Sequence, residues 1–182
     1  MSAVEPDPDF IATVADCWAR SDASDSTYER GHILEELVRH VFGSLPGLSH
    51  WRSRHVTSNG DAEFDVCFSN DIRQSPFPFA EPAMVVECKN TGGPIGSGDV
   101  RNFIAKMQEV QLSWAFLVAA NGITGSGERN TNAHAVIQGA RGRGINLLVI
   151  TRAELEALPS AQGFAELVRE KIMLHTLNAP FF

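Results

Sequence analysis

The sequence predicts a single α/β domain built around a mixed β-sheet, and three observations lead to this prediction. The chain has 182 residues, the length of one domain, and 43% of them are hydrophobic, which supplies a substantial core. Strand-like and helix-like segments alternate from residue 83 onward, a pattern typical of parallel strands connected by helices. Before that point, an Asn-Gly pair separates two strand-like segments and indicates an antiparallel hairpin.

Apolar residues spaced three and four positions apart predict the helices. Residues 27–43 show this spacing most strongly, and Gly43 followed by the Pro46-Gly47 pair predicts where the helix ends. The same spacing is present over 8–20, and a polar, turn-like break separates the two segments. Further helices are predicted over residues 99–110, 132–140 and 164–174.

Alternating or continuous apolar runs predict five strands. Residues 114–120 and 145–151 are continuously apolar, which is typical of parallel strands buried on both faces. Segment 69–82 contains three prolines and is long for a loop of a compact domain, and such loops are usually functional or form an interface. The remaining strands are predicted over residues 51–57, 63–68 and 83–89.

Alternation along the strand predicted over 63–68 assigns its side chains to two faces of the sheet. Successive residues of a strand point to opposite faces, so Phe64, Val66 and Phe68 are expected on one face. Asp65 is expected on the other face, among the polar positions of the strand.

The charge of the chain is unevenly distributed. Its net charge is −7, which by itself argues against a protein that coats nucleic acid, because phosphate binding usually requires a basic surface. Residues 1–30, however, contain seven acidic and two basic side chains, whereas residues 31–152 contain 11 of each. The acidity therefore belongs to the ends of the chain, and the central part remains compatible with a nucleic-acid partner.

Several classes of protein are excluded by composition. No apolar run approaches the roughly 18 residues that a membrane-spanning helix needs. The acidic, proline-containing start differs from a secretory signal, which begins with basic and then apolar residues. Cys17, Cys67 and Cys88 are odd in number and lack C-x-x-C spacing, which favours a reducing compartment and argues against structural zinc. We therefore expect a cytoplasmic protein with no membrane partner.

The strand predicted over 83–89 carries the most informative polar residues. Glu87 and Lys89 lie on one face at its end, where opposite charges on a central strand are costly unless they are paired or bind a ligand. Asp65 belongs to the neighbouring predicted strand, so the two carboxylates can converge and suit a hard cation such as Mg²⁺. Lys89 beside them can orient a water molecule or stabilise charge on a phosphate. A purely structural ion pair of Lys89 with Asp65 or Glu87 is the alternative.

These residues also form a known pattern. The triplet Glu87-Cys88-Lys89 after an apolar strand, with Asp65 in an upstream F-D-V strand, resembles the PD-(D/E)XK nucleases of the restriction-endonuclease-like superfamily. The segment GHILEELV resembles the first core helix of that superfamily, and Glu35 matches the glutamate that this helix often presents to the metal site.

The second half of the chain narrows this resemblance. The segments GSGDVRNFIAKM and WAFLVAANGITG resemble the Mrr-like branch, and the similarity extends over roughly residues 28–152. It implies a restriction-endonuclease-like, three-layer α/β/α fold with a mixed central sheet. It also suggests three parts: an acidic helical extension over 1–27, a nuclease domain over 28–158, and an amphipathic C-terminal helix over 159–182 that packs on the domain or on a partner.

The resemblance implies an activity and a role for each matched residue. It implies a Mg²⁺-dependent endonuclease acting on double-stranded DNA, with Mn²⁺ as a substitute, 5′-phosphate products and a restriction or defence role. Asp65, Glu87 and the backbone carbonyl of Cys88 would hold the metal, and Glu35 would hold a second ion or an outer-shell water. Lys89 would position the attacking water. No separate specificity domain is recognisable, so a homodimer or a partner specificity subunit is expected.

Other parts of the sequence offer further candidate residues, and one alternative function remains. The glycine-rich segment 122–127 follows a buried strand, but it lacks the Lys-Ser/Thr of a Walker A loop and the spacing of a dinucleotide-binding loop, so it favours a flexible connection or a phosphate contact near Arg129. His134 is a candidate to line the cleft. A non-catalytic module that binds nucleic acid or assembles with a partner is the remaining alternative. Pairs of arginines suited to phosphate contacts are Arg52 with Arg54 and Arg141 with Arg143.

Overall fold

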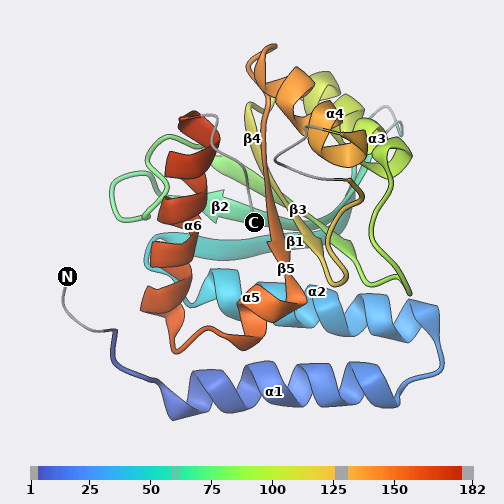
Figure 1. Ribbon diagram of the computed structural model, residues 1–182. Coiled ribbons are helices and arrows are strands. Elements are labelled where there is room, and N and C mark those ends of the chain that lie inside the picture. The colour runs from blue at the N-terminus through green and yellow to red at the C-terminus, as the bar shows by residue number, and fades with distance from the viewer. Residues whose placement is uncertain (1–3, 59, 61, 126–130, 178–182) are drawn as a thin grey trace.

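A five-stranded mixed sheet forms the centre of the molecule (Figure 1). The computed structural model describes residues 4–58, 60, 62–125 and 131–177. The strands lie in the order β1-β2-β3-β4-β5; the β1–β2 and β2–β3 pairs are antiparallel, and the β3–β4 and β4–β5 pairs are parallel. The strands are β1 (Leu48–Val56), β2 (Glu63–Asn70), β3 (Ala83–Lys89), β4 (Trp114–Ala119) and β5 (Asn146–Thr151).

Helices cover both faces of the sheet and make three layers (Figure 1). One face packs against α3 and α4 through an apolar cluster that includes Phe103 and Ile137. The other packs against α1, α2, α5 and α6 through a larger cluster that includes Phe42 and Phe164. This arrangement confirms the predicted three-layer α/β/α fold with a mixed sheet. The helices are α1 (Pro8–Ala23), α2 (Thr27–Gly43), α3 (Ser97–Glu109), α4 (Asn132–Arg141), α5 (Arg152–Glu156) and α6 (Ala161–Thr176).

Local capping explains where the N-terminal helices begin. The Asp7 carboxylate accepts hydrogen bonds from the N–H groups of Asp9 and Phe10, and Pro8 occupies the first turn, where no donor is lost. The Ser26 hydroxyl accepts from the N–H of Glu29 and starts α2. Helix α2 has the predicted bounds, and α1 extends three residues beyond the prediction.

The helix α5 is absent from the sequence-based prediction. It spans only five residues, too few to show an apolar period. Its start is defined by a reciprocal capping box, in which Thr151 accepts from the N–H of Glu154 while the Glu154 carboxylate accepts from the N–H of Thr151.

The two strands at the antiparallel edge differ from the prediction in two respects. β1 begins at Leu48 rather than residue 51, because its first residues pair with the end of β2 as far as Asn70. The expected face of Phe64 was wrong: its side chain packs in the α3–α4 cluster, whereas Val66 and Phe68 pack on the α2 side. Regular alternation is therefore interrupted next to Asp65.

The long loop between β2 and β3 is fixed to the domain. Phe77 is buried in the core, and the Asn70 amide donates to the carbonyls of Phe77 and Glu81. Gly47 lies against this loop with φ +76°, and a Cβ at that position would stand 2.5 Å from the N atom of Ser75. Glycine is thus required there both for its left-handed backbone and for the close approach.

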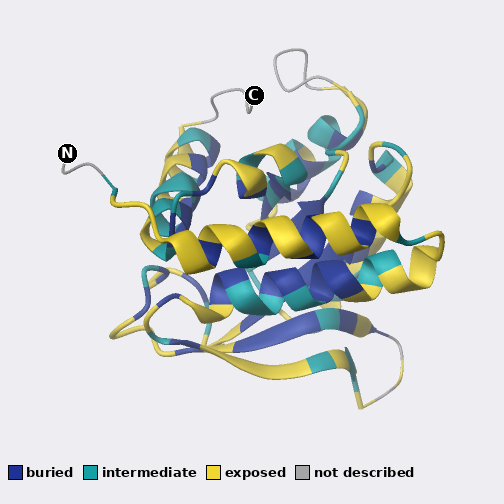
Figure 2. Cartoon of the chain, turned by 90° about the horizontal axis from the view of Figure 1, so that it is seen from below, coloured by how far each residue is buried: buried dark blue, intermediate teal, exposed yellow. Residues whose placement is uncertain are grey.

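The helices near the two ends of the chain, α1 and α6, share the core of the sheet. Buried residues of α1 (Phe10, Trp18) and of α6 (Phe164, Val168) belong to one apolar cluster with the sheet. Figure 2 shows exposed residues along the outer side of α1, as expected for an amphipathic helix covering α2. Within the described residues, no helix is long and apolar enough to cross a membrane. Asn59 of the predicted turn and the NAPFF end lie outside the described residues.

Candidate active site

The strands β2 and β3 part at Asp65. Their backbone pairing runs from Ser69↔Ala83 to Val66↔Val86. One residue further along β2, the Asp65 carboxylate accepts a hydrogen bond from the N–H of Cys88, with an N···Oδ2 distance of 2.7 Å. A side chain thus satisfies a backbone donor that a ladder carbonyl would otherwise satisfy, and it holds the carboxylate at the open end of the strand pair.

Glu87 brings a second carboxylate to the same place. It is 4% exposed, and two ammonium groups surround it. The Lys89 Nζ lies 2.8 Å from Glu87 Oε1, and the Lys106 Nζ lies 3.1 Å from Oε2. Lys106 comes from α3 and also donates to the carbonyl of Glu63, at 2.8 Å. This buried carboxylate is therefore compensated by two cations from different elements.

Sequence reasoning missed Lys106. In α3 it stands three residues after Phe103 and immediately before Met107, at the border of the buried apolar face. A lysine at such a border usually extends toward solvent along its aliphatic stem. Its position beside the apolar stripe is the only sequence signal, and only the packing of α3 on β2 and β3 directs it to Glu87.

The environment shifts the pKa values of the central groups. Burial and the charge of Glu87 raise the pKa of Asp65 to about 6, although the Cys88 N–H, Lys89 and Lys106 act in the opposite direction. Burial alone would lower the pKa of Lys89, but Glu87 and Asp65 outweigh it and the net pKa lies above its ordinary value. Lys89 is therefore an ammonium at neutral pH, and burial together with the charge of Glu87 disfavours the ionised form of Asp65.

Cys88 contributes its backbone rather than its thiol. Burial raises the pKa of the thiol well above its usual range, so the sulfur stays protonated and is a poor ligand. Within an extended strand, the N–H and C=O of one residue face the same neighbouring strand. Because the Cys88 N–H is donated to Asp65, the Cys88 carbonyl faces the same side.

Glu35 lies near this group but is held by other partners. It is buried on α2, and its Oε1 accepts from Arg54 Nη2 at 3.1 Å, while His32 Nδ1 lies 3.6 Å from Oε2. Among the described residues, Glu35 Oε2 has no hydrogen-bond partner. Its negative charge contributes to the raised pKa of the Cys88 thiol, and α2 packs on the face of β3 that carries Val86 and Cys88. The structure thus brings Asp65, Glu87 and Lys89 together and sets Glu35 beside them.

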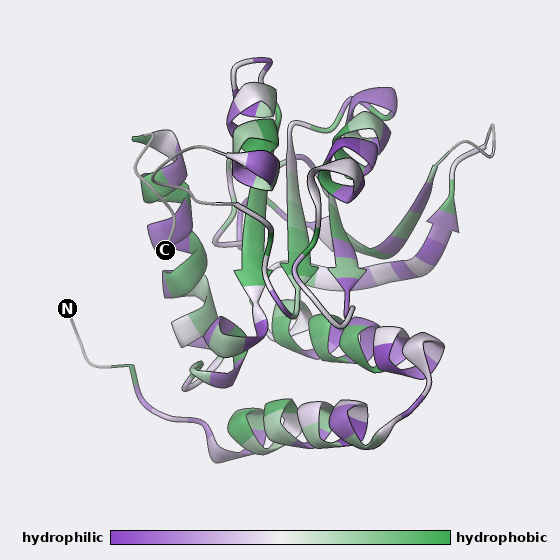
Figure 3. Cartoon of the chain, turned by 45° about the vertical axis from the view of Figure 1, so that its right-hand side comes forward, coloured by the Kyte–Doolittle hydropathy of each residue, from purple (hydrophilic) through white to green (hydrophobic). Residues whose placement is uncertain are grey.

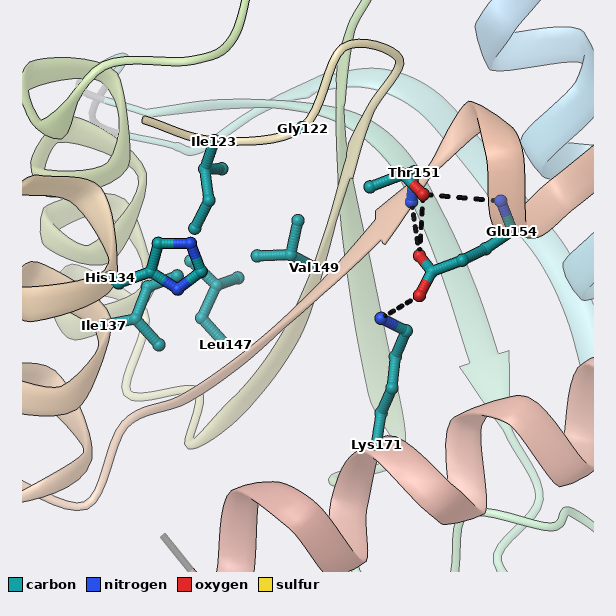
Figure 4. A pocket seen from close by; sticks show the side chains of 9 residues that line it. All are labelled: Gly122, Ile123, His134, Ile137, Leu147, Val149, Thr151, Glu154 and Lys171. Atoms are coloured by element: carbon teal, nitrogen blue, oxygen red, sulfur yellow. Dashed lines mark hydrogen bonds and ion pairs between the residues drawn. The ribbon is translucent and has the colours of Figure 1, made fainter. Parts of the chain in front are cut away.

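His134 lies elsewhere. It lines a cavity of about 210 Å³ beside β5. Figure 4 shows it across from the ion pair between Lys171 and Glu154. Burial lowers the pKa of His134, which favours the neutral imidazole. Arg129 lies outside the described residues. Nowhere in the described part of the chain do three or more His, Cys, Asp or Glu residues form a ready metal cluster.

The arginine pairs singled out from the sequence occupy different places. Arg141, at the end of α4, donates to the carbonyl of Thr176. Arg52 and Arg54 lie on β1, and Arg54 reaches the site through Glu35.

A comparison with known families agrees with this geometry. The Mrr_cat family model, described as a restriction endonuclease, matches residues 29–158. The match covers more than two thirds of the chain and includes all the side chains gathered at the open end of β2 and β3, which confirms the resemblance to the Mrr-like branch. No curated protein matches the chain.

Proposed function

The chain belongs to the restriction endonuclease family, and we propose that it is a Mg²⁺-dependent endonuclease that hydrolyses phosphodiester bonds of DNA. The observation that carries this proposal is the convergence of Asp65 and Glu87 at the open end of β2 and β3, with Lys89 and Lys106 beside them. Paired carboxylates next to fixed cations suit the binding of a metal ion and a phosphate at one point.

The residues present fit a hard divalent cation. Mg²⁺ prefers oxygen ligands, and the Asp65 and Glu87 carboxylates with the Cys88 carbonyl supply them. Burial and then the charge of Glu87 raise the pKa of Asp65, and a bound cation would offset both effects. The buried Glu35 Oε2 offers a further acceptor for an outer-shell water or a second ion. Mn²⁺, with similar ligand preferences, is expected to substitute.

Each side chain has a defined task in the proposed reaction. When bound, the metal supplies Lewis-acid polarisation of the phosphate and a more acidic water. Lys89 orients the attacking water and balances charge that develops on the phosphate, because it is held as an ammonium. Lys106 holds the Glu87 carboxylate in place through its ion pair while Lys89 engages the substrate. Asp65 is held in position by the N–H of Cys88.

The proposal extends to the substrate and its partners. We propose double-stranded DNA as the main substrate, products with 5′-phosphate ends, and a restriction or defence role in the cytoplasm. Because the described part of the chain carries one such site, cutting both strands of a duplex is simplest for a homodimer, and a partner specificity subunit is the other arrangement.

Plasmid cleavage tests the site. The purified protein is expected to nick or linearise supercoiled plasmid with Mg²⁺ or Mn²⁺ and to be inactive in EDTA. Asp65→Asn, Glu87→Gln and Lys89→Ala should each reduce the rate by about 100-fold or more. Glu166→Gln on α6, far along the chain from the site, serves as the matched control and should cleave normally. Undiminished cleavage by the Asp65 and Lys89 variants would overturn the assignment.

One observation favours the non-catalytic alternative. Glu87 is already neutralised by two lysines, as expected of a structural ion-pair cluster. Isothermal titration with Mn²⁺ separates the two functions: binding that disappears in Asp65→Asn supports the nuclease. If Mn²⁺ gives no binding heat with the folded wild type, and the protein binds DNA without cleaving it, the result supports the binding module.

A further inference from the structure

The strand β1 carries a basic and aromatic surface that the proposed chemistry does not use. This surface, here called the β1 strip, consists of His50, Trp51, Arg52, Arg54 and His55. β1 contains no acidic residue, although the whole chain has a net charge of −7. It forms one edge of the sheet, where Figure 2 shows it largely exposed and Figure 3 shows it predominantly hydrophilic. The strip is therefore a local site of positive charge suited to phosphates.

A β-bulge directs Trp51 outward. The β1–β2 register shifts between His50 and Arg52, which leaves Trp51 as the extra residue of the bulge. Its side chain is 54% exposed. The Arg52 guanidinium lies 4.9 Å from the indole centroid, and the His55 ring lies 5.0 Å from it. Among the described residues, no carboxylate pairs with Arg52. A large aromatic face is thus presented to solvent together with an available cation.

A groove lies beside Trp51, and some of its lining residues are close in sequence to the two carboxylates. It has a volume of about 410 Å³, and Trp51 and His55 line it together with apolar side chains of β2 and β3. Two of these are Phe64, the residue before Asp65, and Val85, two residues before Glu87. The groove is concave, mostly apolar and large enough for a nucleobase.

Arg54 connects the strip to the site. It adopts φ +50°, an uncommon conformation for a residue other than glycine. Its guanidinium donates to Glu35 and to the hydroxyl of Tyr28, and lies 5.0 Å from the centroid of the Tyr28 ring. Backbone conformations of this kind recur at functional sites. Arg54 thereby places a second cation and a second exposed aromatic ring between the β1 strip and Glu35.

We propose that the β1 strip and its groove bind a nucleic-acid strand at an unpaired base, with that base stacked at Trp51 and the flanking phosphates near Arg52 and Arg54. This inference rests on the proposed nuclease function and narrows its double-stranded substrate to DNA with single-stranded, forked or unpaired positions. Exposed aromatic faces with neighbouring arginines bind unstacked bases, whereas the faces of bases within a duplex are covered by their neighbours. A duplex without unpaired positions can bind this surface through phosphate contacts alone.

Tryptophan fluorescence in EDTA tests this inference without cleavage. Trp18 is buried and Trp114 half-buried, so Trp51 is the tryptophan open to a ligand. Three probes are compared: a single strand of about 20 nucleotides, its perfect duplex, and the duplex with one unpaired base. The single strand and the interrupted duplex should quench the fluorescence and bind more tightly than the perfect duplex. Equal affinity for all three probes would overturn the proposal and favour phosphate contacts alone.

Variants separate base stacking at Trp51 from phosphate contacts and from the loss of an exposed apolar side chain. Trp51→Ala should weaken binding of the single strand roughly 5- to 150-fold, whereas Trp51→Phe should retain most of the affinity and lose the quenching. Ile72→Ala removes an apolar side chain that is 49% exposed on another loop and should bind normally. Arg52→Gln should reduce the slope of log K against log salt by about 0.7, the value of one phosphate contact on a single strand. Unchanged binding by Trp51→Ala would contradict the inference.

The two proposals fail in different ways. Quenching by unpaired DNA in EDTA without cleavage in Mg²⁺ supports the strand-binding surface and overturns the nuclease. Cleavage in Mg²⁺ together with equal affinity for all three probes in EDTA supports the nuclease and overturns the strand-binding surface.

Discussion

The two halves of the sheet serve different purposes. The parallel half, β4 and β5, is covered on both sides, and Figure 3 shows it as predominantly hydrophobic. The antiparallel edge, β1 with the start of β2, exposes one side and carries the aromatic and basic residues. β3 joins the halves, pairing antiparallel with β2 and parallel with β4. The carboxylates lie at this junction, where β2 has parted from β3 while β4 stays paired to it.

The junction between the two halves tolerates a buried charge. Glu87 follows three buried apolar residues of β3 and remains paired to Leu117 of β4 on one side. On its other side β2 has moved away, which leaves room for Lys106 to enter from α3. The parallel half therefore provides rigidity, and the open end of the antiparallel half provides space and polar access.

The largest expected difference between the halves is in stability. Phe116 of β4 is 1% exposed and contacts the rings of Phe42 and Phe77. Phe116→Ala should lower the free energy of unfolding by about 3–5 kcal/mol, because it leaves a cavity in a dense core. Trp51→Ala on β1 should change it by no more than about 0.5 kcal/mol. Urea denaturation measures both, and similar losses would contradict the division of roles.

The parallel half should lose stability as the pH falls. His175 of α6 is buried, its Nε2 lies 3.0 Å from Asn146 Oδ1, and burial followed by Arg141 lowers its pKa to about 4. Between about pH 6.5 and 4 the unfolded chain binds a proton that the folded chain does not, so stability declines over this window. The total is on the order of 2–3 kcal/mol. His175→Gln should flatten this part of the curve of unfolding free energy against pH.

The contribution of Asp65, at the junction, to the pH dependence of stability should have the opposite sign. The pKa of Asp65 is raised to about 6, so between about pH 4 and 6 the folded chain binds a proton that the unfolded chain has lost. Stability therefore declines as the pH rises through this window, by on the order of 2 kcal/mol. Asp65→Asn should remove this decline in EDTA and stabilise the protein at pH 7. An unchanged pH profile in this variant would show that Asp65 titrates normally.

Much of the architecture was predictable from local patterns. The bounds of α2 and β3 agree with the prediction, because an apolar period over 17 residues and a seven-residue strand ending in Glu87-Cys88-Lys89 are strong local signals. The family was predictable for the same reason, since its motif lies on those elements. The face of Phe64 and the start of β1 were not, because both depend on how β1, β2 and α3 meet.

The sequence alone determined the fold class, the neighbourhood of Asp65, Glu87 and Lys89, and the confinement of excess acidity to the ends of the chain, because periodicity, motif order and charge are properties of the chain itself. The tertiary structure alone decided that Lys106 approaches Glu87, that Arg54 engages Glu35, and that Trp51 is turned outward. These are contacts between elements distant along the chain or consequences of strand register, and helical or strand periodicity specifies only the face on which a residue lies.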